Sequence, residues 1–294
     1  MIEEAALEVY RSLSRRDCED RAFMLGAVGI RSAVVSRDEH FSLDVALADA
    51  SAAHAHLIQY EAENPPPAPP PPVPPLHRHA WIGCLGYAAW LIGVAYVISN
   101  GLVRLDAFHV GELNAARVQS GQWWRAWTAL TLHMSGPHLA ANLGAGVWFG
   151  YLAGRQLGVG VAWLLIVAGG GLANLLEGLF GPPWHRSVGA STAVFTALGL
   201  MSAYTWRDRL RLPQSSVQRW GPLIAGVILL GWLGTAGKHT DVIAHLLGFG
   251  TGLLLGALAA LPAVTRRLHD LPQWPAGLAA IAIMVAAWAC ALAS

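Results

Sequence analysis

The sequence predicts an all-α polytopic membrane protein with seven transmembrane helices, preceded by a small soluble α+β domain. Of the 294 residues, 54% are hydrophobic and only 13% are charged, about half the charged fraction of roughly 25% in soluble domains. Seven apolar segments follow residue 80, and each is judged against the roughly 20 residues that span a bilayer. The basic residues are scattered and the formal net charge is only +1, which argues against a nucleic-acid partner.

The soluble domain is expected over residues 1–63, which are too few to bury a large core. Its pattern predicts two helices with two short strands between them. The expected elements are a polar helix at 19–24, strands at 30–35 and 41–47, and a helix at 48–63.

A linker at 64–79 separates this domain from the membrane part. Its stretch 65–75 is nearly pure proline, which predicts an extended polyproline spacer. A ligand for an SH3-like domain is the alternative, but a semi-rigid tether beside a membrane is favoured.

The cysteines and histidines of the sequence do not indicate a metal site. Cys18, Cys84 and Cys290 stand far apart without metal-ligand spacing, and a disulfide framework is not expected. His54 and His56 are two residues apart and therefore lie on different faces of their helix. We expect neither a metal nor a cofactor.

The apolar segments define a core of six helices over 80–261, followed by a connecting loop and a seventh helix over 262–294. The second and fourth segments are short, which would leave room above them for the water that a hydrolase needs. The segments run over about 80–100, 138–154, 158–180, 190–206, 220–236, 241–261 and 275–293.

Arginines crowd into the short loops on the side of the N-terminal domain, which predicts that this domain is cytoplasmic. The starts of the fourth and sixth segments then face the outside. The connection 101–137 is rich in aromatic residues and is expected to be structured and partly embedded in the membrane. Within it, Trp124 and Arg125 lie where an interfacial belt is expected, and ordinary interfacial anchoring explains these residues as well as a structured loop does.

The run from Arg186 to Phe195 places Ser191 just after a short polar loop, where a long apolar segment begins. A serine at a helix start is usually an N-cap. A later apolar segment, however, carries His245 four residues after Asp241, also near its start. Two helices that enter the membrane in the same direction can bring a nucleophile and a base within hydrogen-bond reach.

Two more polar residues lie near the start of the second segment. His138 and Asn142 are four residues apart and share a helix face. Each one alone is most simply explained by an interhelical hydrogen bond. Together with Ser191 and His245 at a similar outer depth, they are candidate donors to a developing oxyanion.

The sixth segment carries glycines at four-residue spacing, Gly248, Gly252 and Gly256, which form a groove along one helix face. We expect the helix of Ser191 to pack into this groove, with Ala193 and Ala197 as its small residues.

In their order and spacing, these motifs resemble those of the rhomboid intramembrane serine proteases. The resemblance covers 80–261 and implies a rhomboid-like helical bundle with an extra helix in a six-plus-one arrangement. The N-terminal module is similar to the small cytoplasmic domains of many bacterial rhomboids, which implies a bacterial inner-membrane protein. The matching residues are Trp124, Arg125, His133, His138, Asn142, Gly189, Ala190, Ser191, His245, Gly248 and Gly252.

The resemblance implies a role for each site residue. Ser191 would be the nucleophile and His245 the general base, without an aspartate. His138 and Asn142 would line the oxyanion hole with the backbone N–H of Ser191. His133 would be structural, at the junction of loop and helix.

The sequence departs from the family pattern at three places. Thr192 follows the nucleophile where glycine is usual, and its β-branch narrows the space there. Phe195 replaces a tyrosine and keeps the ring without the hydroxyl, so His245 is expected to be positioned by packing alone. A glutamate near the inner end of the second helix is replaced by Arg155 and Gln156.

The expected function is hydrolysis of transmembrane protein substrates near the outer face of the bilayer. The first alternative is an inactive rhomboid-like protein that binds membrane clients, but such proteins typically lack the serine or the histidine. The second is a transporter, which would have charged residues within several spans, whereas only Glu177 comes close to this pattern.

Overall fold

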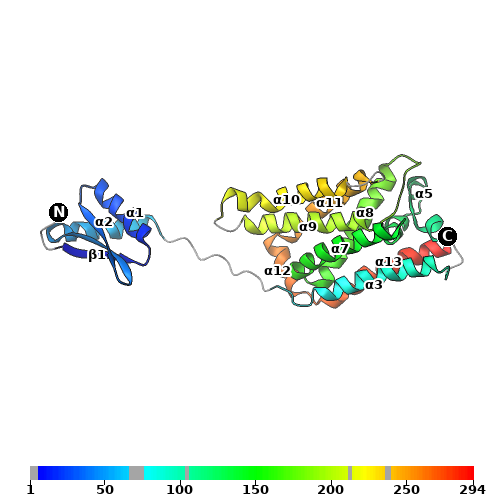
Figure 1. Cartoon of the computed structure of the whole chain (residues 1–294), viewed down its shortest axis with the longest axis horizontal. Coiled ribbons are helices and arrows are strands. Elements are labelled where there is room, and N and C mark those ends of the chain that lie inside the picture. Colours follow the sequence, from blue (N-terminus) through cyan, green and yellow to red (C-terminus); the bar gives the residue numbers. More distant parts are fainter. Residues whose placement is uncertain (1–5, 66–75, 103–105, 211–213, 236–239) are drawn as a thin grey trace. The chain divides into compact units, whose positions relative to one another are not determined.

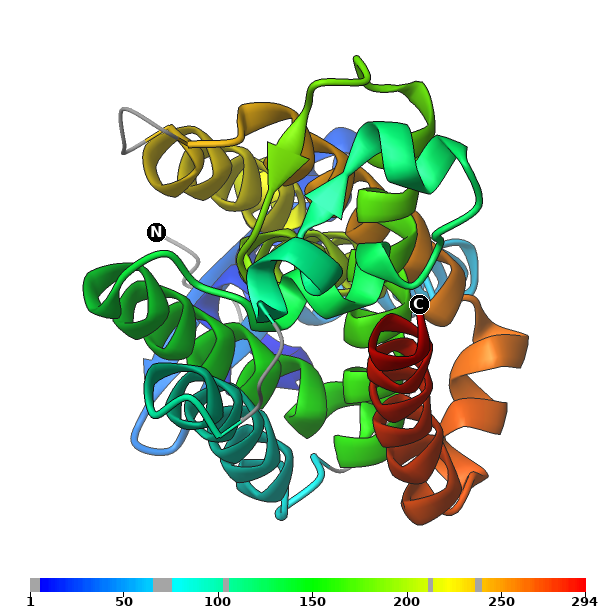
Figure 2. The same cartoon turned by 90° about the vertical axis from the view of Figure 1, so that its right-hand side faces the viewer.

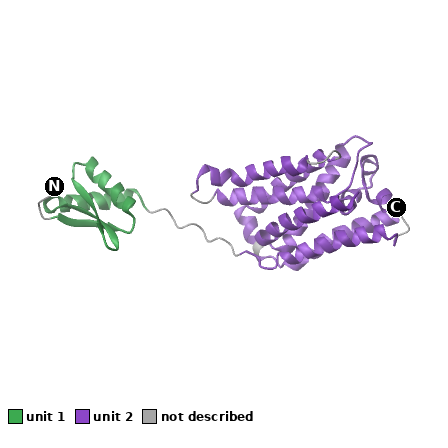
Figure 3. Ribbon diagram, in the orientation of Figure 1, with its two compact units in different colours: residues 1–71 green, residues 72–294 purple. Residues whose placement is uncertain are grey.

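The chain divides into two compact units, 1–71 and 72–294 (Figure 3). The predicted proline spacer falls almost entirely on 66–75, outside the described residues. The computed structural model describes residues 6–65, 76–102, 106–210, 214–235 and 240–294.

The first unit is a small α+β fold, as predicted. Its three strands form an antiparallel sheet in the order β1-β3-β2. Leu25, Leu43, Val45 and Leu57 are buried at its core. The elements are β1 (Ala6–Ser12), α1 (Arg15–Ala27), β2 (Ser32–Arg37), β3 (His40–Ala46), the single-turn η1 (Leu47–Asp49) and α2 (Ala50–Glu63).

Strand β1 is absent from the sequence prediction. Its register with β3 shifts between Glu8 and Tyr10, and Val9 is its one buried residue. Such a bulge disturbs the alternation of apolar and polar residues that identifies a strand. Helix α1 is also longer than predicted, because Ser14 caps its start by accepting a hydrogen bond from the N–H of Asp17.

The second unit is a bundle of long helices, which confirms the predicted helical membrane fold (Figure 1). Among the described residues, seven helices of at least 18 residues coincide with the seven predicted segments. Four of them, α3, α8, α11 and α13, are long and apolar enough to cross a membrane. That the other three also span it stays a prediction. The seven are α3 (Trp81–Ser99), α7 (Gly136–Leu157), α8 (Val159–Phe180), α9 (Ser191–Arg209), α10 (Ser216–Gly234), α11 (Val242–Ala259) and α13 (Gln273–Ala293).

Helices α7 and α9 are not short, contrary to the prediction. Helix α7 has 22 residues, because Ser135 caps a start before the apolar run and the helix continues past Arg155. Helix α9 has 19 residues and continues through the polar residues up to Arg209. An apolar run therefore underestimates a helix whose ends are polar.

One end of the bundle carries short elements (Figure 2). Most of them lie between α3 and α7, so this connection is structured, as predicted. Strand β4 pairs with β5 and thereby ties the connection to the loop before α9. The elements are α4 (Ala107–Gly111), β4 (Leu113–Asn114), α5 (Ala115–Gln119), α6 (Arg125–Thr128), η2 (Ala129–Thr131) and β5 (Arg186–Ser187), while α12 (Pro262–Asp270) joins α11 to α13.

Arg125 is buried inside this connection, at 1% exposure, so its interpretation as an interfacial residue is wrong. Its guanidinium donates to the carbonyls of Glu112 and His109 at 2.9 and 3.0 Å, and to Oε1 of Gln122 at 2.6 Å. Burial lowers its pKa to about 10, which leaves it protonated at neutral pH. Trp124 precedes it and packs edge-on against a neighbouring tryptophan. The pair is thus part of the internal framework of the connection.

Helices α9 and α11 pack backbone against backbone. Three glycines of α11 lie against backbone carbonyl groups of α9, so a Cβ atom at any of these three would overlap the opposite helix. The predicted partner helix is correct, but Ala193 packs against Gly170 of α8 and is not among the atoms nearest to these glycines. Ala197 is likewise not among the atoms nearest to these glycines. The close pairs are Gly248 with Thr192, Gly252 with Thr196, and Gly256 with Leu200.

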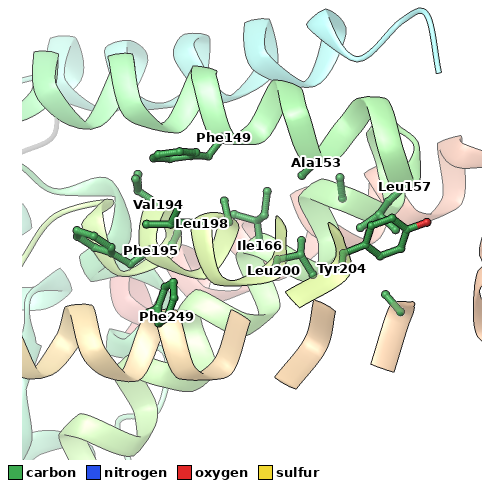
Figure 4. Packing of buried hydrophobic residues seen from close by; sticks show 14 of the residues in the cluster. Phe149, Ala153, Leu157, Ile166, Val194, Phe195, Leu198, Leu200, Tyr204 and Phe249 are labelled. Atoms are coloured by element: carbon green, nitrogen blue, oxygen red, sulfur yellow. The ribbon is translucent and has the colours of Figure 1, made fainter. Parts of the chain in front are cut away.

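A hydrophobic core joins four of the long helices (Figure 4). Phe149 of α7, Ile166 of α8, Leu198 of α9 and Phe249 of α11 are all buried in it. Phe195, one turn into α9, belongs to the same cluster. The start of α9 is therefore firmly packed.

Hydrogen bonds anchor the last helix, α13, near both of its ends. Nε1 of Trp288 donates to Oγ1 of Thr131 at 3.2 Å. Near the other end, Oε1 of Gln273 accepts the N–H groups of Gly160 and Val161, each at 3.1 Å. The side chain of Gln273 thereby caps α8, whose own N-cap residue is a glycine without a side chain.

Candidate active site

Ser191 is the first residue of α9, and its hydroxyl faces a histidine. The N-cap position belongs to Ala190, which makes no side-chain cap. The N-cap alternative for Ser191 is therefore wrong. Its Oγ lies 2.9 Å from Nε2 of His245.

His245 lies in the first turn of α11 and is 6% exposed. The helix start is fixed by Asp241, whose Oδ1 accepts the N–H of Ala244 at 3.1 Å. Nδ1 of His245 lies 3.0 Å from the carbonyl oxygen of Gly234, at the end of α10. Since a carbonyl can only accept, Nδ1 carries the proton and Nε2 presents its lone pair to the hydroxyl of Ser191.

The position of His245 rests on more than packing, contrary to the sequence expectation. The ring of Phe195 does pack against the imidazole, with 4.3 Å between centroids and a 37° angle between planes. The hydrogen bond to Gly234 adds a directional restraint that also fixes the tautomer. Sequence reasoning missed Gly234 because its contribution is a backbone carbonyl, which leaves no side-chain signature.

Gly189 makes room for His138 beside the nucleophile. Its φ is +135°, a conformation that favours glycine. A Cβ atom there would lie 2.8 Å from Cε1 of His138 and 3.8 Å from Oγ of Ser191. The N–H of Gly189 donates to the carbonyl of Ala129 at 2.9 Å, which fastens this turn to η2. The imidazole of His138 and the hydroxyl of Ser191 thus border one small space.

This pairing of a serine with a correctly oriented histidine lies within a stretch that matches a known family. The family model of the Rhomboid domain matches residues 120–262. The chain therefore contains a domain of the rhomboid family. Most members are intramembrane serine proteases acting on transmembrane substrates, and this rhomboid is accordingly an integral membrane protein. The match leaves out the N-terminal unit, α3 and α13.

Asn142 of the rhomboid is buried at 5% exposure on α7, one turn after His138. Its Nδ2 donates to the carbonyl of His138 at 3.1 Å. The backbone carbonyl of Asn142 accepts a hydrogen bond from the hydroxyl of Tyr87, which lies on α3, at 2.9 Å. Among the described residues the carbonyl of His138 is the one acceptor of the Asn142 side-chain amide, so its second N–H remains for another acceptor.

His133 lies just before α7 and contacts the residue that precedes Ser191. Its Nε2 accepts the N–H of Ala190 at 3.3 Å, and its ring lies edge-on to that of His138, with 5.1 Å between centroids. Thr192, on the other side of Ser191, is 2% exposed. The residues flanking the nucleophile are therefore held from two directions, by the α6–α7 connection and by α11.

Proposed function

We propose that this rhomboid is an active serine endopeptidase that cleaves transmembrane segments, with Ser191 as nucleophile and His245 as general base. The observation that carries the proposal is the 2.9 Å contact between Oγ of Ser191 and Nε2 of His245. The bond from Nδ1 to Gly234 supports it, because it leaves Nε2 free of a proton. A neutral imidazole with this tautomer is what a general base requires.

The reaction begins when Nε2 of His245 takes the hydroxyl proton as Oγ of Ser191 attacks the scissile carbonyl carbon. The tetrahedral intermediate collapses when the imidazolium returns this proton to the leaving amine, which frees the new amino terminus. A water molecule then repeats the sequence on the acyl-enzyme, with His245 again as base, and releases the carboxyl product.

The oxyanion would be stabilised by three groups. The N–H of Ser191 is in the first turn of α9, where backbone donors have no partner within the helix. The side chains of His138 and Asn142 would add the other donors. Losing one such donor typically costs about 100-fold to 1000-fold in rate.

The substrate class follows from the chemistry of a membrane helix, whose amides are hydrogen-bonded and shielded. We infer single-span proteins with small or helix-breaking residues near the outer face, where a segment unwinds most easily. We further propose that the N-terminus lies in the cytoplasm and that the dyad faces the outside of a bacterial inner membrane, because the arginine distribution favours this orientation.

The test is cleavage of a transmembrane reporter by the full chain, Ser191→Ala, His245→Ala and a control, Ser202→Ala. Ser202 lies on the same helix, and its hydroxyl bonds only back to Leu198 among the described residues. We expect the control to retain activity and the two dyad variants to lose about 1000-fold or more. Equal cleavage by all four proteins would eliminate the dyad assignment.

Labelling with a fluorophosphonate tests the nucleophile without a substrate. The full chain and Ser202→Ala should label in detergent, whereas Ser191→Ala should not. A folded protein that neither labels nor cleaves would instead be an inactive rhomboid that binds membrane clients.

A further inference from the structure

Three potential metal ligands meet at the end of the bundle that carries Ser191, although the sequence places them far apart. Glu177 lies near the end of α8, His185 in the following loop, and Asp241 at the N-cap of α11. Nε2 of His185 lies 3.4 Å from Oε1 of Glu177 and 3.1 Å from Oδ2 of Asp241. One ligand atom from each residue lies within 4.8 Å of the others.

The carboxylate of Glu177 is the most unusual of the three groups. Glu177 is 4% exposed, and neither of its oxygens accepts a hydrogen bond within the described part of the chain. Nε2 of His185 likewise has no partner with hydrogen-bond geometry there. Because an unpaired buried charge is costly, buried carboxylates are paired or coordinate metals. An ion between these groups would satisfy both at once.

Asp241 and His185 are positioned by hydrogen bonds that leave their ligand atoms free. Asp241 uses Oδ1 to cap α11 at Ala244, so that Oδ2 remains to face His185. The backbone N–H of His185 donates to Pro182 and its carbonyl accepts the N–H of Ala115. The cluster is therefore preorganised by secondary structure on both sides.

We propose that Glu177, His185 and Asp241 bind a divalent transition-metal ion of the zinc type. Two carboxylates and a neutral imidazole carry two negative charges, which a divalent ion neutralises. The imidazole nitrogen favours zinc and similar ions over calcium and magnesium, which prefer oxygen ligands alone. Water would complete the tetrahedral coordination.

The ion would act on the architecture around the dyad rather than on the peptide bond. It would join the end of α8, the loop that leads into Ser191, and the cap of the helix that carries His245, one turn before that residue. Bound metal would therefore stabilise the relative placement of α9 and α11. This inference does not depend on catalysis and is tested without it.

The experiment uses the full chain with Ser191→Ala in detergent, stripped with a chelator and then titrated with zinc sulfate. Calorimetry should show one saturable site with a dissociation constant in the micromolar range or below, and Tm should rise with occupancy. Magnesium and calcium should bind far more weakly.

Two isosteric variants and one control make the test specific. Glu177→Gln and Asp241→Asn should each weaken zinc binding by about 10-fold or more and should therefore reduce the rise in Tm at a given zinc concentration. Asparagine caps a helix as well as aspartate does, so Asp241→Asn should keep α11 intact without metal. Glu112→Gln removes a carboxylate that pairs with Arg186 outside the cluster, and it should bind zinc like the parent.

The proposal is overturned if the parent shows no saturable zinc binding, since Glu177 would then share a proton within the cluster. It is equally overturned if Glu177→Gln and Asp241→Asn bind zinc as tightly as Glu112→Gln does. The zinc ion would in that case bind to other histidines.

Discussion

The ring centroid of Phe195 lies 4.3 Å from that of the His245 imidazole, with an angle of 37° between the two ring planes. These residues come from α9 and α11, the two helices that also supply the close glycine contacts. The aromatic contact and the bond to Gly234 restrain different motions of the imidazole. The ring blocks sideways displacement, and the carbonyl prevents rotation.

Phe195→Leu should therefore lower kcat by about 3-fold to 10-fold, as expected from the loss of an aromatic pair of about 0.5–1.5 kcal/mol. Phe195→Tyr keeps the ring and should stay within about 3-fold of the parent, on the same energetic grounds. Cleavage kinetics on a reporter in detergent check both. Equal rates for Phe195→Leu and Phe195→Tyr would show that the ring does not position the base.

Gly189→Ala is expected to disable the site. Its φ of +135° disfavours any residue with a Cβ atom, and the added atom would lie 2.8 Å from Cε1 of His138. Strain of about 1–3 kcal/mol together with displacement of His138 should lower kcat by at least about 10-fold, as 1.4 kcal/mol already gives that factor.

The control for Gly189→Ala is Gly144→Ala on α7, where the new methyl group meets no atom within 4 Å. Alanine favours a helix interior over glycine by about 1 kcal/mol, so this variant should keep its activity and its Tm. Full activity in Gly189→Ala would contradict the close approach of His138.

Much of the bundle could be predicted from apolar segments, because a membrane helix must satisfy its backbone internally and shows this in about 20 consecutive residues. The encounter of Ser191 with His245 could be anticipated for a related reason, since both lie at helix starts on the same side. Apolar runs do not predict the helix ends, because α7 and α9 continue through the polar residues Arg155 and Arg209.

The features that escaped prediction depend on tertiary contacts. The carbonyl of Gly234 orients His245, and no residue type reports such a carbonyl. Arg125 resembles an interfacial arginine until its three acceptors are known. Glu177 and Asp241 are separated by more than sixty residues, and the return of the chain along α10 to the start of α11 brings them together.

Gly252→Ala should destabilise the bundle through the contact between α9 and α11. Its Cβ atom would overlap the backbone carbonyl of Thr196, which cannot rotate away. Overpacking of this kind costs about 1–3 kcal/mol, so Tm should fall by several degrees.

Gly250→Ala, on the opposite side of the same helix, is the matched control because its methyl group meets no atom within 4 Å. It should leave Tm unchanged or raise it. Thermal unfolding in one detergent compares the two variants, and equal values would refute the backbone packing at Gly252.

Gln273→Ala should weaken the attachment of α13 to the start of α8. Oε1 of Gln273 accepts the N–H groups of both Gly160 and Val161, and no cap comes from Gly158. Losing a cap of this kind costs about 0.5–2 kcal/mol, which should appear as a lower Tm in detergent. Gln273→Glu keeps the acceptor and adds a negative charge at a helix N-terminus, a favourable placement worth about 0.3–1 kcal/mol. This variant should therefore match or exceed the parent in Tm, while equal losses in both variants would mean that Gln273 contributes through packing rather than through its carbonyl oxygen.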